Sequence, residues 1–82
     1  MASLREIRDM ISKYPKSKIK VSSWLPFRPE GGIWGKNYIL RTIDYMLFLR
    51  DSGQNSEYWK YRRNYGDLID KAYEVAKKEV EG

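Results

Sequence analysis

The chain has 82 residues, enough for one small domain whose core buries about 60–65% of the surface that the unfolded chain exposes. It contains neither Cys nor His, which excludes disulfides, ordinary zinc sites, thiolate nucleophiles and imidazole bases. The net charge is +5, and the excess lies in residues 1–66, where 13 Lys and Arg face 6 Asp and Glu, a distribution that favours a polyanionic partner.

The first predicted element is a helix over residues 3–14. Ser3 followed by Glu6 matches a capping box, which satisfies free amides at a helix start. The apolar side chains after this cap recur at helical spacing, as Leu4, Ile7, Ile11 and Tyr14. Pro15 ends the helix, because the residue before a proline is pushed out of the helical region.

Residues 16–24 alternate with period two, which predicts a half-buried strand. Ile19 and Val21 share the face expected to be buried. The other face is expected to carry Lys16, Lys18, Lys20, Ser22 and Trp24. A strand needs a backbone partner, and the best internal candidate is residues 32–36, returning as a hairpin, while the alternative is another subunit.

Two longer helices follow, over residues 37–51 and 56–81. Asn37 is the expected N-cap of the first, and Gly53 lies just past its end. The final helix carries an apolar stripe opposite charged residues spaced four apart. The expected fold is therefore mainly α (α+β), a three-helix small domain over residues 1–82 with a minor β-strand or hairpin between the first and second helices.

The helix over residues 37–51 has more apolar side chains than one stripe needs. Tyr45 and Phe48 lie on the far side from its main apolar face. Such a helix is either the central one of the domain or offers a second apolar face to a protein partner. A strand over residues 38–43 is the less favoured alternative.

No pattern in the sequence indicates catalysis. The carboxylates at helical spacing in the last helix, Asp67, Asp70 and Glu74, stand among lysines that neutralise them. The stretch PEGGIWGK lacks the spacing of a phosphate-binding loop, and Asn37 stands where Ser or Thr would bind magnesium. We predict a protein that is not an enzyme and has no cofactor and no metal.

The lysine face of the predicted strand is the first candidate nucleic-acid surface. Lys16, Lys18 and Lys20 would stand roughly 6.6 Å apart, close to phosphate spacing along a strand, and Trp24 continues the face as a stacking platform. Arg28 and Lys36 add charge nearby. The alternative is that these lysines protect an exposed strand edge against aggregation.

The second candidate surface lies in EYWKYRRNYG, residues 57–66. Trp59, Arg62 and Arg63 share one flank of the helix near its start, and Arg is a preferred donor to phosphates and base edges. The alternative, slightly favoured, is that Trp59 packs inward and Arg62 extends along the core.

Aromatic side chains also mark possible protein contacts. In WLPFRPEGGIWGK, residues 24–36, Phe27 and Trp34 either cover the small core or form an exposed patch suited to a protein partner. With Tyr45 and Phe48 they are the candidate protein-interaction residues.

The preferred functional prediction is a non-enzymatic nucleic-acid-binding protein of low sequence specificity, for DNA or RNA. The alternative is a protein-interaction or assembly protein, such as a small viral or phage structural subunit or an inhibitor of another protein, with self-association possible. No apolar run approaches the roughly 20 residues of a membrane span, and no signal-peptide core is present. We expect an intracellular, cytoplasmic protein without membrane contact, or a virion-associated one if viral, and its composition is thermophile-like.

Overall fold

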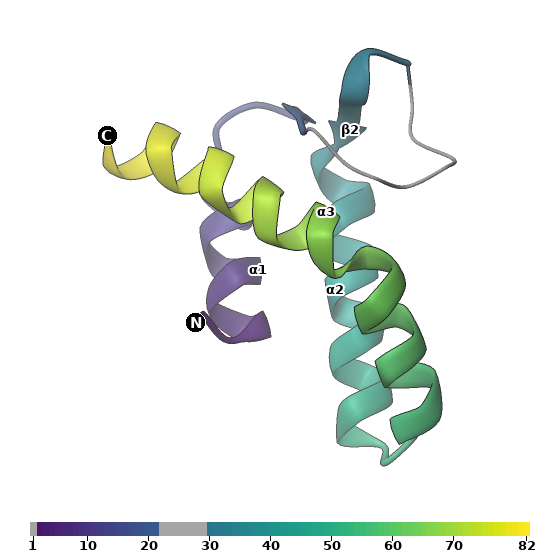
Figure 1. Cartoon of the computed structure of the whole chain (residues 1–82). Coiled ribbons are helices and arrows are strands. Elements are labelled where there is room, and N and C mark those ends of the chain that lie inside the picture. Colours follow the sequence, from purple (N-terminus) through teal and green to yellow (C-terminus); the bar gives the residue numbers. More distant parts are fainter. Residues whose placement is uncertain (1, 22–29) are drawn as a thin grey trace.

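The computed structural model describes residues 2–21 and 30–82. These residues form, in order, α1 (Leu4–Ser12), β1 (Lys18–Lys20), a short 3-10 turn η1 (Glu30–Gly32), β2 (Ile33–Gly35), α2 (Lys36–Asp51) and α3 (Asn55–Glu81). Figure 1 shows the first half of α3 beside α2 and its second half crossing α1. The predicted mainly helical fold, with a hairpin between the first and second helices, is confirmed. Within the described residues, no helix is both long enough and apolar enough to cross a bilayer.

The hairpin is a two-stranded antiparallel sheet that packs one face on the helices. Ile19 and Trp34 face each other across the strands and are both buried, because alternate residues of a strand point to the same side. Beyond the paired residues, the Val21 N–H donates to the Gly32 carbonyl at 2.8 Å. The pairing register is Lys18 with Gly35, Ile19 with Trp34 and Lys20 with Ile33. β1 is shorter than the strand predicted over residues 16–24, of which residues 22–24 lie outside the described residues, and it finds its partner within the chain, as predicted.

The helix ends follow the expected signals with two corrections. The Glu6 N–H donates to the Ser3 side chain at 3.2 Å, as the capping pattern predicted, although α1 ends at Ser12, two residues early. The prediction that Asn37 caps α2 is wrong: Gly35 holds the cap position, because β2 runs directly into the helix. Gly53, with φ +76°, follows the end of α2 as predicted.

The core lies between the three helices and the inner face of the hairpin. Each helix contributes one stripe of apolar side chains, and the hairpin closes one end. The buried set comprises Leu4, Ile7, Ile11, Tyr14, Ile19, Val21, Trp34, Ile39, Ile43, Met46, Leu47, Leu68, Ile69, Ala72 and Ala76.

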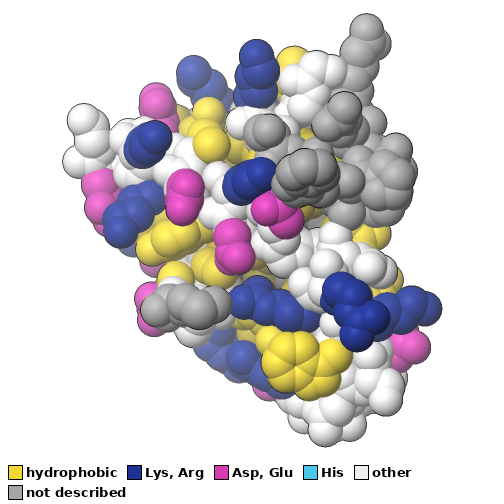
Figure 2. Space-filling view, viewed as in Figure 1, with side chains coloured by type: hydrophobic (Ala, Val, Ile, Leu, Met, Phe, Trp, Pro, Cys, Tyr) yellow, Lys and Arg dark blue, Asp and Glu magenta, His cyan; other side chains and the backbone are white. Residues whose placement is uncertain are grey.

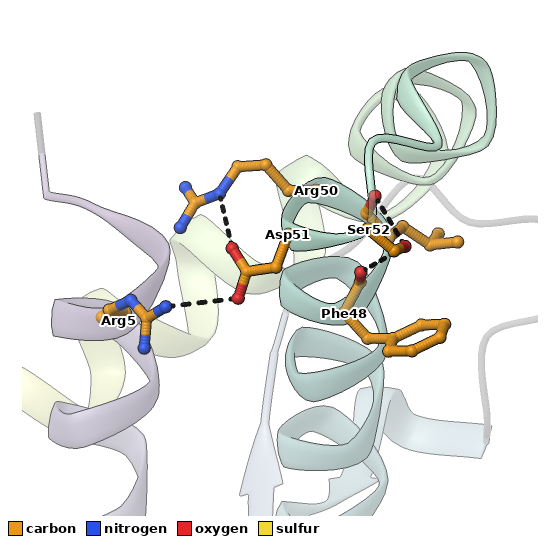
Figure 3. A network of polar contacts seen from close by, with 6 residues as sticks. Arg5, Phe48, Arg50, Asp51 and Ser52 are labelled. Atoms are coloured by element: carbon orange, nitrogen blue, oxygen red, sulfur yellow. Dashed lines mark hydrogen bonds and ion pairs between the residues drawn. The ribbon is translucent and has the colours of Figure 1, made fainter.

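Ion pairs align α1 antiparallel to α2. Figure 3 shows Arg5 of α1 reaching Asp51 near the end of α2, at 3.3 Å, with Arg50 on the other carboxylate oxygen. One helical turn further along α1, Arg8 forms a two-point contact with Asp44, and this hydrogen bond and the opposite charge raise the pKa of Arg8. Exposed pairs of this kind contribute at most about 1 kcal/mol each, so their main effect is to set helix orientation and to neutralise this side of the molecule.

Candidate nucleic-acid interface

The outer face of the hairpin carries exposed lysines. Lys16, Lys18 and Lys20, called the hairpin lysine face below, are all exposed, while Ile19 and Val21 are buried. The backbone explains this: the strand alternates, and only one of its two faces can meet the helices. Ile33, paired with Lys20 across the strands, is 47% exposed on the same outer side. Lys18 and Lys20 thus share the outer face of β1, and Lys16, two residues before the strand, is exposed as well.

These lysines stand outside the ion pairs of the described side chains. The basic residues that pair with carboxylates there are Arg5, Arg8, Lys13, Arg50 and Lys71. None of them belongs to the predicted nucleic-acid set. Among the described side chains, the cations outside these ion pairs include the hairpin lysines and the basic residues of the first half of α3, together with Arg41, Lys77 and Lys78.

Lys36 has a different environment from the other predicted lysines. It is half-buried at the start of α2, and its ammonium donates to the Tyr14 carbonyl at 3.0 Å. This bond ties the exit of the hairpin to the segment that follows α1. The Lys36 ammonium is consequently less accessible to a ligand than the ammonium groups of the three exposed lysines.

The start of α3 presents the second basic surface. Trp59 is 61% exposed, so the prediction that it packs inward is wrong. Arg63 is exposed, and Arg62 is half-buried, with an Nη1 atom that has no hydrogen-bond acceptor among the described residues. Figure 2 shows Lys and Arg side chains beside a hydrophobic patch where the first half of α3 runs along α2. Trp59, Arg62 and Arg63 are called the α3 patch below.

The two basic surfaces lie on different elements of the fold. The hairpin leads into the first residue of α2, whereas the α3 patch lies beside the second half of α2, where Tyr61 of α3 meets Tyr45. Sixteen helical residues at about 1.5 Å each make α2 about 24 Å long. The hairpin lysine face and the α3 patch are therefore separate surfaces.

Trp34 belongs to the core. It is 4% exposed, so its assignment to an exposed protein-interaction patch is wrong, and the alternative of a core-covering side chain holds. The register places it opposite Ile19 on the inner face of the hairpin. Three other predicted residues, Trp24, Phe27 and Arg28, lie outside the described residues.

The outward face of α2 carries an aromatic stripe, defined here as Tyr38, Tyr45 and Phe48. All three are exposed, Phe48 at 58%. Phe48 stacks on Tyr45 at 6.3 Å between ring centroids, and Tyr45 meets Tyr61 of α3 edge-on at 5.1 Å. Burial, followed by the neighbouring Tyr38 hydroxyl, raises the pKa of Tyr65 behind the stripe. Sequence reasoning identified Tyr45 and Phe48 but missed Tyr38, which the regular helical spacing of the exposed aromatics could have indicated.

The remaining surface offers little for chemistry. A shallow hollow between α1 and α2 is lined by Arg5, Arg8, Asp9, Asp44 and Leu47, and ion pairs already engage its guanidinium groups. Among the described residues, no group of three or more acidic side chains could hold a metal ion.

Comparison with known proteins yields no match: no family model, no curated protein and no solved structure matches this chain.

Proposed function

We propose that the protein binds nucleic acid without catalysing a reaction, and that the hairpin lysine face is its main electrostatic contact. The observation that carries this proposal is the pattern of ion pairing. Carboxylates neutralise the basic residues between α1 and α2, whereas Lys16, Lys18 and Lys20 stay exposed and outside the ion pairs of the described side chains. Three such ammoniums within five residues attract a polyanion.

The spacing of the lysines suits a phosphate backbone. Lys18 and Lys20 lie two residues apart on one strand, roughly 6.6 Å along it. Each phosphate that a lysine neutralises releases a counterion, which makes the binding depend steeply on salt. Lysine acts as a point charge and reads no base edge, so the expected binding has low sequence specificity.

Replacing all three lysines of the hairpin lysine face by glutamine is expected to weaken binding and to flatten its salt dependence. At a slope of about 0.9 per phosphate, three contacts account for about 40-fold in affinity between about 50 mM and 200 mM salt. Fluorescence anisotropy with a labelled DNA duplex, repeated across salt concentrations, measures both quantities.

The matched control removes the same charge elsewhere. Lys71, Lys77 and Lys78 of α3, replaced together by glutamine, lower the net charge equally and leave the hairpin unchanged. We expect this control to keep most of the wild-type slope. Equal losses in the two triple variants would show that only net charge matters, and an affinity that does not change with salt would refute the electrostatic proposal.

A second candidate function is assembly through the aromatic stripe of α2, with a second copy of the chain as the partner. Tyr38, Tyr45 and Phe48, with Arg41 between them, follow the alternating three- and four-residue spacing of a helix-pair seam. Exposed aromatics at this spacing favour packing α2 against another α2. Phe48, the most exposed of the three, would lie in the contact.

Phe48→Glu is expected to convert any dimer to monomer, because it places a charge in the apolar seam. Sedimentation velocity over a range of concentrations measures this change. Val80→Glu, at an exposed apolar position in the last turn of α3, is the matched control and should leave the oligomeric state unchanged. A wild-type protein that stays monomeric at all concentrations would rule out this second candidate.

A further inference from the structure

The start of α3 exposes a tryptophan whose ring position is supported by a neighbour. Trp59 has 61% of its surface exposed, the largest fraction among the described large apolar residues. Among the described residues, the Trp59 ring contacts the ring of Tyr58. The two rings meet edge-on, with 5.2 Å between their centroids and 76° between their planes. An edge-on neighbour orients the indole without stacking on it, so it does not take the place of a stacked ligand.

Two arginines border this indole. Arg62 and Arg63 follow Trp59 by three and four residues, which on a helix places one on each side of it, a turn further along. Neither arginine belongs to an ion pair among the described side chains. The nearby carboxylate of Asp67 pairs instead with Lys71, at 3.4 Å. The α3 patch therefore combines an open aromatic ring with two cations whose charge is not neutralised.

Arg62 lies partly buried beside this ring. Its Nη1 atom is buried and lacks a hydrogen-bond acceptor among the described residues. Burial of part of a guanidinium reduces the screening of its charge by water, so an anion that arrives beside it is attracted more strongly than at a fully solvated cation.

We infer that the α3 patch binds an unpaired nucleic-acid segment, with a base stacked on Trp59 and the adjacent phosphates held by Arg62 and Arg63. In a duplex the base faces are covered by neighbouring bases, so an indole that protrudes from a helix gains a stacking partner only from an unpaired base. Arginine forks bind phosphate oxygens in pairs, which fits a backbone that passes beside the ring. This inference rests on the proposed nucleic-acid function and adds that the ligand is single-stranded at this surface.

The test compares single-stranded and duplex probes on the full chain. For an oligothymidylate of about 15 nucleotides, or the corresponding oligouridylate, Trp59→Ala is expected to lower the affinity about 5- to 100-fold. For a duplex of the same length, the affinity should change less than about twofold, because the hairpin lysine face carries that contact. Trp59→Phe should retain part of the single-strand affinity, because a phenyl ring still stacks.

Val80→Ala is the control, since it removes an exposed apolar side chain from the other end of α3. It should leave both affinities unchanged. Two results would overturn the inference while leaving the proposed function intact. In the first, Trp59→Ala binds single strands as tightly as the wild type does. In the second, Trp59→Ala loses affinity equally for single strands and for duplex. Failure of the wild-type protein to bind any of the probes would instead refute the proposed function, and the inference with it.

Discussion

Replacing Trp34 by alanine is expected to lower the free energy of unfolding by about 3–5 kcal/mol. Trp34 is 4% exposed and packs on the inner face of the hairpin, opposite Ile19. The substitution removes the largest side chain of the core and leaves a cavity that the short strands and three helices fill only in part. For a domain of this size, such a loss is a large share of the total stability.

Urea denaturation followed by far-ultraviolet circular dichroism measures this change without relying on tryptophan emission. Trp59→Ala removes the same side chain from an exposed position, and it should change the free energy of unfolding by no more than about 0.5 kcal/mol. Similar losses in the two variants would contradict the assignment of Trp34 to the core and of Trp59 to the surface.

Gly32→Ala is expected to destabilise the protein by about 2–4 kcal/mol. Gly32 has φ +68°, and a Cβ atom there would lie 2.7 Å from the Val21 carbonyl oxygen. The same glycine accepts the hydrogen bond from the Val21 N–H that continues the strand pairing. The alanine variant therefore combines backbone strain with the loss of a hairpin contact.

The adjacent glycine separates these two effects. Gly31 has φ +70°, but a Cβ atom there would meet only the Ile33 side chain, at 3.8 Å, an ordinary contact distance. Gly31→Ala should therefore show backbone strain alone, about 1–2 kcal/mol. Thermal or urea denaturation of both variants checks the difference, and a Gly31→Ala variant as unstable as Gly32→Ala would disprove the proposed clash.

The helices and the strand could be predicted because their apolar side chains repeat with clear periods. Ile7 and Ile11 follow the helical period, and Ile19 and Val21 follow the strand period, and all four are buried as expected. The return strand could be proposed from the proline and glycine content of the connection. Burial energy dominates in these elements, so local patterns were sufficient.

The remaining features depend on contacts between elements. Asn37 looks like a helix cap in sequence, but β2 enters α2 without a turn and moves the cap to Gly35. The side on which Trp34 lies is set by strand register, which no local pattern specifies. The exposure of Trp59 depends on which face of α3 meets α2, and the apolar stripe of α3 was too broad to decide that.

The presence of two basic surfaces on one small domain has a consequence for how long a ligand stays bound. A nucleic-acid strand that touches both the hairpin lysine face and the α3 patch is attached at two points on different elements of one small domain. Once one point is engaged, the other encounters its part of the strand at a high effective concentration. Two individually weak contacts can then give a long residence time, because dissociation requires both to open before either closes again.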